Sequence, residues 1–454
     1  MKILISGAGI AGSSLAFWLG KLGHNVTVIE WYPQLRTTGL QLDLRGHGIE
    51  VLKRMGLEAA FRAKAAPEQG LQIVDSTGRR RAFFPANKSG KGLQSFTSEF
   101  EIMRGDLCRL LYDAAVENRA RYVFGSSIES FEDKGDSVEV RFKRTGGAEG
   151  KGEGQKETTA TTTTTETERF DLLVGADGQW SRTRKMMLGS DTEGVYPLHG
   201  QHIAYFSIPR PADESKGQEE YVATAYIAPG KRGVQLRRNN PHQLQVYLGC
   251  TPVGAELERI SSVRRGDVAA EKEAIAEIFR GAGWQTEEIL EQMLKKGGEG
   301  EDGFYCERMI VVKLKGWSRG RVALTGDAAW TPSANTGMGT TSAVVGAYIL
   351  AGEIGRHCGG RVGQGQDRDA TGTATDNLAA ALRAYQERFT PFMDQVQKGI
   401  VERKDFYPTT PFAISVMTNM MSLASFLRLD VLARFFLRED VKGWDLPTYE
   451  ELLD

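Results

Sequence analysis

The first thirty residues constrain the fold of this chain more than any other stretch. A short apolar run, Lys2–Ser6, leads into the turn Gly7-Ala-Gly9-Ile-Ala-Gly12, and a helical pattern follows from Ser13 to Leu22. A second apolar run then ends in Glu30, eighteen residues beyond the last glycine of the turn. A GxGxxG turn alone would be weak evidence, but strand, turn, helix, strand and terminal acid together form a complete dinucleotide-binding fingerprint. The sequence therefore predicts a bound adenine dinucleotide here and leaves open which one.

Each residue of this fingerprint has a predicted role. Gly7 permits the tight turn, Gly9 lets a pyrophosphate approach the backbone, and Gly12 lets the helix pack closely on the strand. The N-terminus of the helix faces the phosphates, where the helix dipole favours negative charge. Glu30 can accept hydrogen bonds from the hydroxyls of a ribose.

Composition and charge exclude several other classes of function. The net charge is −1 and the sequence pI is about 6.7, so there is no electrostatic basis for binding nucleic acid. The four cysteines are scattered without metal-ligand spacing, which is typical of reduced thiols in a cytoplasmic protein and predicts no metal site. No uncharged apolar run of about eighteen residues occurs, so we expect no stable membrane insertion. The apolar N-terminus is explained by the first strand and is not interpreted as a signal peptide.

At 454 residues the chain is long enough for two or three domains. Residues 1–75, 98–190 and 304–404 carry an α/β pattern and are assigned to one discontinuous dinucleotide-binding domain. Residues 76–97 and 191–303 are assigned to a second domain, because alternating, aromatic-rich strands recur there as in a largely antiparallel sheet.

Two segments stand apart from these domains. Residues 145–168 are rich in Gly, Lys, Glu and Thr and contain no core-forming residue, so we expect a disordered loop between paired strands. Residues 405–454 are expected to form a C-terminal helix, since Met, Leu and Phe recur at helical spacing from Phe412 to Phe436. That helix is expected to pack on the body of the protein and not in a membrane.

Two further apolar strands end in a glycine and an acid. The first leads into Gly175-Ala-Asp177-Gly178 and the second into Gly326-Asp327. A loop with Pro332 and the turn Gly337-Met338-Gly339 then precedes an apolar helix predicted over Thr340–His357. An Asp at the carboxyl end of a strand suits hydrogen bonding to ribose or ribityl hydroxyls in a crevice at the sheet edge. Taken singly, each acid is more often one that merely caps a turn.

Together and in this order, the three strand ends resemble the class A flavoprotein monooxygenases, the para-hydroxybenzoate hydroxylase-like family. The resemblance covers about residues 1–60, 98–190 and 304–356 well, and the intervening sheet only by pattern. Leu40–Gly46 and Arg104 are more similar to the tetracycline-modifying branch than to the phenol hydroxylases. The resemblance implies an α/β fold: a Rossmann-like FAD-binding domain of the glutathione-reductase type, an antiparallel-sheet substrate domain and C-terminal helices.

The resemblance also implies that FAD is held, without a covalent bond, along the length of the first domain. Glu30 would bind the adenosine ribose, and Arg104, which opens a helix, would neutralise the pyrophosphate. Asp327 in the Gly326-Asp327 turn would bind the ribityl chain or the pyrophosphate. Asp177 would have a role shared between the flavin and the nicotinamide cofactor.

Other residues are expected near the reactive ring. Arg36 and Asp43 match positions near the flavin and cofactor in the tetracycline-modifying branch. The Gly337-Met338-Gly339 turn, after Pro332, would bring backbone N–H groups and a helix N-terminus toward the flavin ring. Such a positive end would stabilise the anionic reduced flavin.

The chain departs from the pattern of the family in two respects. The residue after Gly-Asp-Ala-Ala is Trp330, where the family usually has His. The Asn common near Thr341 and the Asp common near Gly346 are also absent. Because those positions are often structural, the departures bear on detail and not on FAD.

The resemblance implies that NAD(P)H reduces the flavin and that O2 then gives a C4a-hydroperoxide, which hydroxylates or epoxidises an electron-rich carbon. A second GxGxxG unit is missing, so NAD(P)H has no dedicated domain. The aromatic sheet suggests a lipophilic aromatic or polycyclic small molecule as substrate. Side chains of the expected sheet that would line its pocket, with packing roles about equally expected, are Tyr205, Tyr226, Gln235, Arg237 and Tyr247.

Two other functions remain open from the sequence alone. A flavin-dependent oxidase, reductase or oxidative cyclase could use the same scaffold, and it would differ in its consumption of NAD(P)H. A non-catalytic dinucleotide-binding protein is disfavoured by the intact third motif. The sequence is compatible with a monomer or a homodimer.

Overall fold

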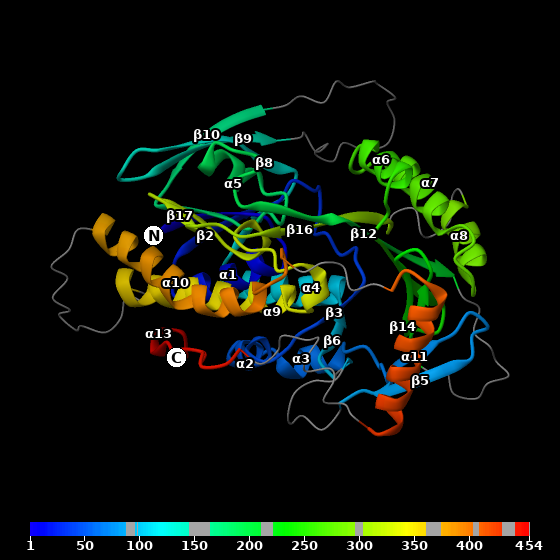
Figure 1. Cartoon of the computed structure of the whole chain (residues 1–454). Helices are drawn as coiled ribbons and strands as arrows, with labels where there is room; N and C mark the ends of the chain where they lie inside the picture. Colours follow the sequence, from blue (N-terminus) through cyan, green and yellow to red (C-terminus); the bar gives the residue numbers. More distant parts are fainter. Residues whose placement is uncertain are drawn as a thin grey trace, which may run out of the picture.

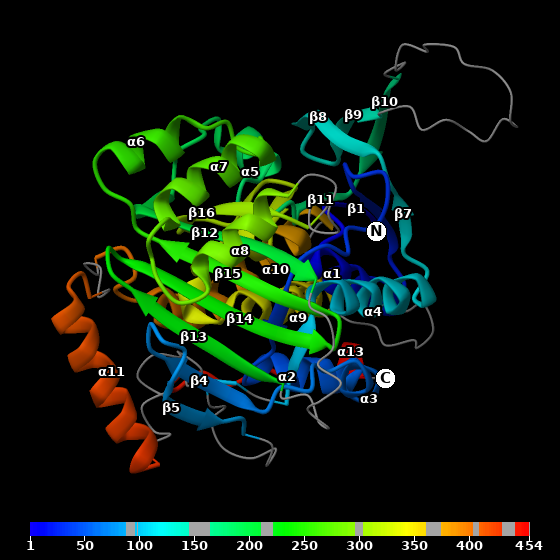
Figure 2. The ribbon, with the colours of Figure 1, turned by 90° about the vertical axis from the view of Figure 1, so that its right-hand side faces the viewer.

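A computed structural model gives the fold. It describes residues 1–87, 96–97, 99–144, 164–209, 221–295, 303–359, 374–402, 408–428 and 441–453. Two large sheets, each with its own hydrophobic core, account for most of the described chain (Figures 1 and 2).

The first sheet contains the dinucleotide fingerprint and has six strands in the order β17-β18-β11-β1-β2-β7. All neighbouring strands are parallel except β17 and β18. The inner strands are almost continuous apolar runs with little exposed area, as expected for parallel strands covered on both faces. The strand bounds are Lys2–Ser6 (β1), Asn25–Ile29 (β2), Arg121–Val123 (β7), Leu172–Gly175 (β11), Ser318–Arg319 (β17) and Val322–Leu324 (β18).

Helices and a small sheet cover this first sheet. Helices α1, α9 and α10 form a layer on one side, and the three-stranded sheet β10-β9-β8 lies on the other (Figure 1). Helix α9 is central, because its residues from Thr341 to Gly355 are all buried. The bounds are Ile10–Lys21 (α1), Arg104–Glu117 (α4), Gly339–Cys358 (α9), Ala374–Gln397 (α10), Ser126–Asp133 (β8), Val138–Arg144 (β9) and Thr164–Phe170 (β10).

The second sheet has seven strands in the order β16-β12-β15-β14-β13-β4-β5. It is antiparallel apart from the β13–β4 pair. Helices α6, α7 and α8 lie against one face and share a core with it (Figure 2). The bounds are Gly70–Val74 (β4), Arg80–Pro85 (β5), Val195–Pro209 (β12), Val222–Ala228 (β13), Arg232–Asn240 (β14), Gln243–Cys250 (β15), Tyr305–Val312 (β16), Ala255–Ser262 (α6), Val268–Phe279 (α7) and Thr286–Leu294 (α8).

Short elements complete the described chain. The antiparallel ribbon β3–β6 is held to the second sheet by Gln41, whose backbone N–H donates to Gln245 Oε1 of β15 at 3.1 Å. The remaining bounds are Gln41–Asp43 (β3), Glu101–Met103 (β6), His47–Arg54 (α2), Glu58–Ala63 (α3), Arg182–Leu188 (α5), Gly326–Ala328 (η1), Ala334–Thr336 (η2), Pro411–Phe426 (α11) and Glu450–Leu453 (α13).

The predicted mixed α/β class is confirmed, but segment boundaries differ from the expected ones. Strand β4, inside the range 1–75, pairs with β13 and β5 in the second sheet, and β16, at the start of 304–404, pairs with β12. Periodicity shows that such a run is a strand, whereas its sheet is decided by distant partners. Strand β7 extends the first sheet next to β2.

The two segments set apart by composition also differ from expectation. Residues 164–168, the end of the expected disordered loop 145–168, lie in β10 and pair along β9, because polar strand side chains can point to solvent. The rest of that loop lies outside the described residues. Residues 405–454 form no single helix: α11 ends at Phe426 and α13 is separate.

Helix α11 covers the open edge of the second sheet at β5. Ser425 Oγ accepts a hydrogen bond from the backbone N–H of Phe83 at 3.0 Å and donates one to its carbonyl at 2.7 Å. Ser422 Oγ donates to the carbonyl of Arg81 at 2.5 Å. These hydroxyl groups satisfy backbone groups that an edge strand would otherwise leave unpaired.

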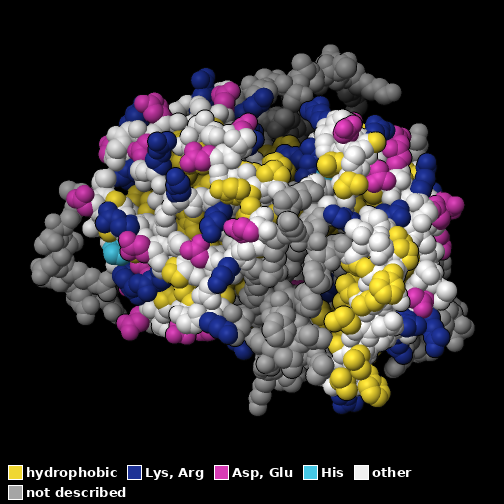
Figure 3. Space-filling view, viewed as in Figure 1, with side chains coloured by type: hydrophobic (Ala, Val, Ile, Leu, Met, Phe, Trp, Pro, Cys, Tyr) yellow, Lys and Arg dark blue, Asp and Glu magenta, His cyan; other side chains and the backbone are white. Residues whose placement is uncertain are grey.

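The outer side of α11 is apolar and solvent-exposed, and it forms the yellow stripe at the right of Figure 3. Its exposed side chains are Phe412, Val416, Met420, Leu423 and Phe426. No helix in the described ranges has both the length and the apolar character needed to cross a membrane. The four cysteines are free thiols, and Cys108, Cys250 and Cys306 are buried.

Candidate functional site

The three glycine-and-acid motifs meet at one edge of the first sheet. Strand β1 lies between β2 and β11, and β11 in turn pairs with β18. In register, Ser6 is opposite Gly175, and Gly175 is opposite Leu324. The three turns therefore begin side by side at the carboxyl ends of parallel strands, where open α/β sheets bind their ligands.

The first turn leaves its middle glycine open. Gly7 has a φ of 111°, and a Cβ there would lie 2.5 Å from the carbonyl oxygen of Ala176. A Cβ on Gly12 would lie 2.0 Å from the carbonyl oxygen of Gly7. Gly9, by contrast, has no heavy atom within 4 Å of such a Cβ and precedes the first residue of α1. An open backbone at a helix N-terminus fits a diphosphate.

Glu30, at the end of β2, holds the first turn in place. Its Oε2 accepts a hydrogen bond from the backbone N–H of Ala8 at 3.0 Å, and its Oε1 accepts one from Tyr32 at 3.1 Å. The carboxylate is half-buried beside the turn. Its contact with a ribose remains a prediction.

Asp327 lies in the third turn, against the first. Gly326 has a φ of 60°, and a Cβ there would be 2.5 Å from the Cβ of Ala11 in α1. Burial raises the pKa of the Asp327 carboxyl to about 6, although Arg104 and Arg184 both act to lower it. A carboxyl group at this edge can accept hydrogen bonds from the hydroxyls of a nucleotide.

Arg104 and Arg36 belong to one loop–helix contact. Arg104, the first residue of α4, donates through Nη1 to the carbonyls of Arg36 at 3.2 Å and Thr38 at 2.9 Å. The Arg36 guanidinium lies over two aromatic rings, 5.3 Å from the centroid of Tyr32 and 5.9 Å from that of Tyr305. Arg36 therefore joins the cofactor domain to β16 of the second sheet.

Asp177 acts as a helix-capping residue. Its Oδ1 accepts from Ser181 Oγ at 2.5 Å, and its Oδ2 accepts from the backbone N–H groups of Arg182 at 2.9 Å and Thr183 at 3.0 Å. These bonds fix the N-terminus of α5. The expected contact with the cofactors stays a prediction, since the carboxylate is already engaged here.

Arg184, which the sequence reading did not single out, links the second and third motifs. It is 1% exposed and donates to the carbonyl of Ala328 at 3.0 Å and to that of Gln179 at 2.7 Å. No motif in the sequence predicts a buried arginine at position 184, in the first turn of α5. Only a charged residue followed by apolar Met186 and Met187 hints at it.

Asp43 is paired with a buried arginine. Its Oδ2 accepts from Arg45 Nη2 at 2.8 Å, whereas its buried Oδ1 has no hydrogen-bond partner. The backbone N–H of Arg45 donates to Thr341 Oγ1 at 2.9 Å. This contact ties the β3 loop to the first turn of α9.

The loop before α9 presents a helix N-terminus. Pro332 and Met338 are buried, Gly337 has a φ of 64°, and Met338 caps the helix. Gly339, the first helical residue, has open space at its Cβ position. With 20 residues, α9 has a positive end of the kind the sequence predicts beside the flavin ring.

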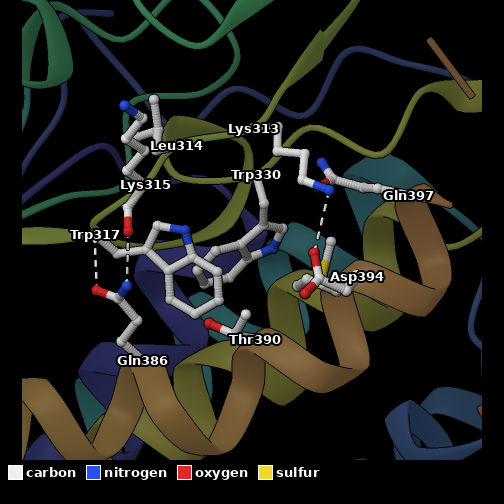
Figure 4. Close-up of a pocket in the computed structure, with 10 residues that line it drawn as sticks. Lys313, Leu314, Lys315, Trp317, Trp330, Gln386, Thr390, Asp394 and Gln397 are labelled. Carbon is white, nitrogen blue, oxygen red and sulfur yellow. Dashed lines mark hydrogen bonds and ion pairs between the residues drawn. The ribbon is translucent and has the colours of Figure 1, made fainter. Parts of the chain in front are cut away.

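Trp330 points away from this edge, toward α10. Its ring is 4.6 Å from that of Trp317 and 5.0 Å from that of Phe389. The small pocket beside it is bordered by Lys313 and Asp394, whose side chains form a 3.2 Å ion pair (Figure 4). At about 50 Å³ that pocket has room for a few water molecules and not for an aromatic substrate.

Four of the five expected pocket residues share one face of the second sheet, opposite α7 and α8. Tyr205, Tyr247 and Gln235 stand in one row across β12, β15 and β14, and Arg237 follows two positions on. Tyr226 was wrongly expected with them. It lies on the other face, where its hydroxyl donates to the carbonyl of Ala282 at 2.8 Å, because its register partner is Val234 and not Gln235.

The tyrosine row is extended by Tyr305 of β16. Tyr205 stacks on Tyr305 with centroids 4.7 Å apart, and meets Tyr247 edge-on at 5.4 Å. Burial raises the pKa of Tyr205 well above its ordinary value, and that of Tyr305 to about 12. The hydroxyl groups therefore stay protonated at neutral pH and can donate hydrogen bonds.

Arg237 is engaged in a buried ion cluster. It donates to both oxygens of Glu68, at 2.7 and 2.8 Å, and also pairs with Glu101. Gln41 Nε2 donates to Glu68 at 3.0 Å and to Glu101 at 2.5 Å. The cluster joins β14 to the β3–β6 ribbon. The guanidinium of Arg237 is therefore engaged in structural ion pairs, and a role in contacting substrate is secondary.

Known proteins share both sequence and fold with this chain. The FAD binding domain family profile matches residues 1–366. "FAD-dependent monooxygenase asL4" of Sarocladium schorii is 48% identical over 100% of this chain and 99% of its own. "Flavin-dependent monooxygenase eupH" of a Phoma species is 40% identical over 87% of this chain and 84% of its own. The crystal structure of tetracycline destructase Tet(55) superposes with a TM-score of 0.72, at 27% identity, over 99% of this chain and 98% of that one.

Proposed function

Since this chain belongs to the FAD binding domain family and is a FAD-dependent monooxygenase, we propose that it uses NAD(P)H and O2 to hydroxylate or epoxidise a lipophilic, aromatic or polycyclic molecule. The observation that carries the proposal is that the edge with the glycine turns and the tyrosine row are connected. The edge with the three glycine turns belongs to the first sheet, and Arg36 connects that domain to the tyrosine row of the second.

The residues at the sheet edge suit FAD. The open backbone at Gly9, at the start of α1, would bind the diphosphate, and Glu30 would bind the adenosine ribose. Asp327, on which the charges of Arg104 and Arg184 act, would bind the ribityl chain or the diphosphate. The N-terminus of α9 would face the flavin ring, where its N–H groups favour negative charge.

FAD, when bound, supplies the electron-transfer and oxygen-transfer chemistry that amino-acid side chains lack. The protein positions the substrate and excludes water. The row formed by Tyr305, Tyr205 and Tyr247 offers flat apolar rings for stacking and protonated hydroxyls for hydrogen bonds. Such a face favours planar ring systems that carry oxygen substituents.

The substrate class also has support from similarity. The structural neighbour Tet(55) is named a tetracycline destructase, so a related fold acts on a polycyclic compound. NAD(P)H would bind at the surface of the same crevice, since the chain has one dinucleotide fingerprint. We propose no preference between NADH and NADPH.

The test is substrate-stimulated reduction of the bound flavin. Purified holoenzyme is mixed anaerobically with NADPH or NADH, with and without planar polycyclic phenols, and loss of the flavin absorbance is followed. Aerobic turnover under isotopically labelled oxygen then shows whether one oxygen atom enters the product. Faster reduction with a phenol and one labelled atom in the product are the expected results.

The same measurements separate the alternatives. An oxidase or oxidative cyclase would change the substrate and consume oxygen without consuming NAD(P)H. If neither NADH nor NADPH reduces the bound FAD under any condition, the proposal is contradicted. Tyr205→Leu, compared with Tyr226→Leu on the far side of the sheet, tests the stacking face. Only Tyr205→Leu is expected to raise KM for the phenol.

A further inference from the structure

Helix α11 turns polar groups toward the protein and a row of large apolar side chains toward solvent. Its serine hydroxyls bond to the backbone of β5, and Asn419 Oδ1 accepts a hydrogen bond from Arg81 Nη2 at 2.9 Å. On the outer side, Phe412, Met420 and Phe426 are 79%, 66% and 84% exposed. A surface helix ordinarily packs its apolar stripe on the core and leaves its polar side in water. The described part of the chain therefore leaves this stripe uncovered.

The stripe is continuous and uncharged. Val416, Leu423 and Leu427 complete it, and its members from Phe412 to Leu423 are three or four residues apart, on one side of the helix. Residues 411–427 contain no charged side chain. Figure 3 shows the stripe as one yellow surface, and in Figure 2 helix α11 stands at the outer edge of the molecule. Apolar residues exposed singly are normal, whereas a contiguous patch marks an interaction site.

The charges next to the stripe are mainly positive. The hairpin that α11 covers carries the run Arg79-Arg80-Arg81, and Arg428 follows the last turn of the helix. Three of these four arginines are exposed: Arg79, Arg80 and Arg428. Asp75 is the one acid in residues 75–85 and 409–428, and it already accepts a hydrogen bond from the backbone N–H of Arg79 at 3.1 Å.

The wider surroundings do not reverse this balance. The tip of the hairpin meets the turn between α7 and α8, since a Cβ at Gly78 would lie 3.3 Å from Trp284 Nε1. The turn between β13 and β14 is also close, because the backbone N–H of Gly230 donates to the carbonyl of Thr409. The charged residues at these two turns are Glu287, Glu288, Lys231, Arg232 and Arg280.

These charges favour a lipid surface as the partner. Arginines beside an uncharged apolar helix complement the anionic headgroups and the acyl chains of a bilayer. A second copy of the chain is less well matched. A two-fold contact through α11 would bring two sets of the same arginines together, and like charges that face each other oppose association.

Helix α11 also lies at the end of the face that carries the tyrosine row. Beyond Gln235, the register partners on this face are Ala225 of β13, Ile73 of β4 and Ala82 of β5. Ile73 and Ala82 belong to a small apolar cluster, and Met421 of α11 packs against it. The apolar face of the second sheet therefore continues from the tyrosine row to this helix.

We propose that α11 is an interfacial helix that docks the enzyme on an anionic membrane. Its exposed stripe enters the headgroup region, and the neighbouring arginines contact lipid phosphates. With 16 residues, α11 lies in the surface and does not cross it, because a spanning helix needs roughly 20. A lipophilic substrate dissolved in the same membrane would reach the tyrosine row from the β5 edge. That last step rests on the proposed function, whereas docking itself requires neither FAD nor turnover.

Co-sedimentation of the full-length holoenzyme with vesicles tests the docking. Wild type is expected to sediment with vesicles of equal parts phosphatidylcholine and phosphatidylserine, and less with phosphatidylcholine alone. Phe412→Ser combined with Phe426→Ser should weaken binding to the mixed vesicles by at least about tenfold, since two apolar side chains lose their burial. Arg79→Gln combined with Arg80→Gln should weaken it by roughly fivefold per arginine at low salt.

Matched controls come from the cofactor domain. Trp31→Ser removes another large exposed side chain, which is 64% exposed, and Arg109→Gln removes an exposed cation of α4, on the opposite side of the molecule in Figure 2. Both variants are expected to bind vesicles as wild type does. Equal losses in these controls would show unspecific adsorption and overturn the proposal. Retained flavin absorbance shows that each variant is folded.

A tryptophan placed in the stripe gives a second readout. The emission of Met420→Trp, after subtraction of the wild-type spectrum, is expected to shift to the blue when mixed vesicles are added. Val116→Trp places the same reporter at an exposed position of α4 and should show no shift. An unshifted spectrum for Met420→Trp overturns the proposal.

Two further outcomes also decide against a membrane. Wild type that stays in the supernatant with both kinds of vesicle overturns the proposal. A lipid-free dimer that Phe412→Ser with Phe426→Ser converts to a monomer, without vesicle binding by wild type, assigns the stripe to a second copy instead. Flavin reduction by NAD(P)H is measured without vesicles, so failure of the docking and failure of the proposed function are distinguishable.

Discussion

Gly346 of α9 lies against the ring of Trp330. A Cβ at position 346 would be 2.4 Å from Cζ2 of the indole and 3.0 Å from the ring of Phe389. Trp330 is one of the positions where the sequence departs from the expected family pattern, and Gly346 lies near another; the structure shows the two residues in contact. The large side chain of Trp330 fits because the residue of α9 that faces it, Gly346, has no side chain.

Gly346→Ala is therefore expected to destabilise the protein. The added methyl group overpacks a core in which Trp330 is 1% exposed, which costs about 1–3 kcal/mol of unfolding free energy. Thermal denaturation measures the loss. Gly249→Ala is the control, because a Cβ at Gly249 meets no atom within 4 Å. Equal melting temperatures for the two variants would show that the helix can move to make room.

Arg237→Met should destabilise the protein more strongly. The substitution removes the Arg237 guanidinium from the buried carboxylates of Glu68 and Glu101, and breaking a buried ion pair in this way costs about 3–5 kcal/mol. Arg141→Met removes a surface pair with Glu129 and should cost less than about 1 kcal/mol. Denaturant titration compares the two. A similarly small loss of stability in both variants would contradict a stabilising role for the Arg237 ion cluster.

Asp327→Asn is expected to weaken FAD binding by about 10- to 100-fold. Hydrogen bonds to a charged group contribute about 1.5–3 kcal/mol, and the charges of Arg104 and Arg184 favour the ionised form of this carboxyl. Ultrafiltration followed by the flavin absorbance measures retained cofactor. Asp106→Asn, an acid of α4 whose partner Lys64 is also at the surface, serves as the control. Full retention by Asp327→Asn would remove Asp327 from the cofactor site.

His24 makes stability depend on pH. Burial, and then the N-terminal ammonium group, lower the pKa of His24 from 6.5 to about 4. Between pH 6.5 and 4 the unfolded chain binds this proton and the folded chain does not, so the contribution is complete above pH 6.5 and is lost as the pH falls toward 4. The stability of His24→Gln should therefore fall less steeply than that of wild type as the pH is lowered from 6.5 to 4.

The control for His24 is His242→Gln, an exposed residue in the turn between β14 and β15. Melting temperatures from pH 4 to 7 are compared among the three proteins. Asp327, whose pKa is raised by burial, contributes with the opposite sign, but it does so equally in each variant. Parallel curves of melting temperature against pH for wild type and His24→Gln would show that His24 does not cause the pH dependence.

Local patterns predicted that the three glycine turns lie together at one edge of the first sheet. The glycines, Glu30 and Asp327 each follow a short apolar strand, and parallel strands align their carboxyl ends, so sequence order alone brought them together. The family and its use of FAD were predicted from the same turns. Position within a motif therefore carried information about position in space.

Contacts between distant segments could not be predicted in this way. Arg184 lies in no motif, and its partners are backbone carbonyls of two separate turns. Tyr226 was misplaced because alternation along β13 gives two faces but not which of them packs on helices. The Arg237 cluster depends on β3 and β6 reaching β14, which no local pattern encodes.

The buried position of Trp330 also makes its intrinsic fluorescence a reporter of cofactor binding. Trp330 is three positions from Asp327 along the chain, a span of at most about 11 Å, and its neighbour Trp317 is 4% exposed. An oxidised flavin absorbs light in the range where such shielded indoles emit. Resonance energy transfer should therefore dim the blue-shifted tryptophan emission as the cofactor loads, and recovery of that emission would report its loss without any label.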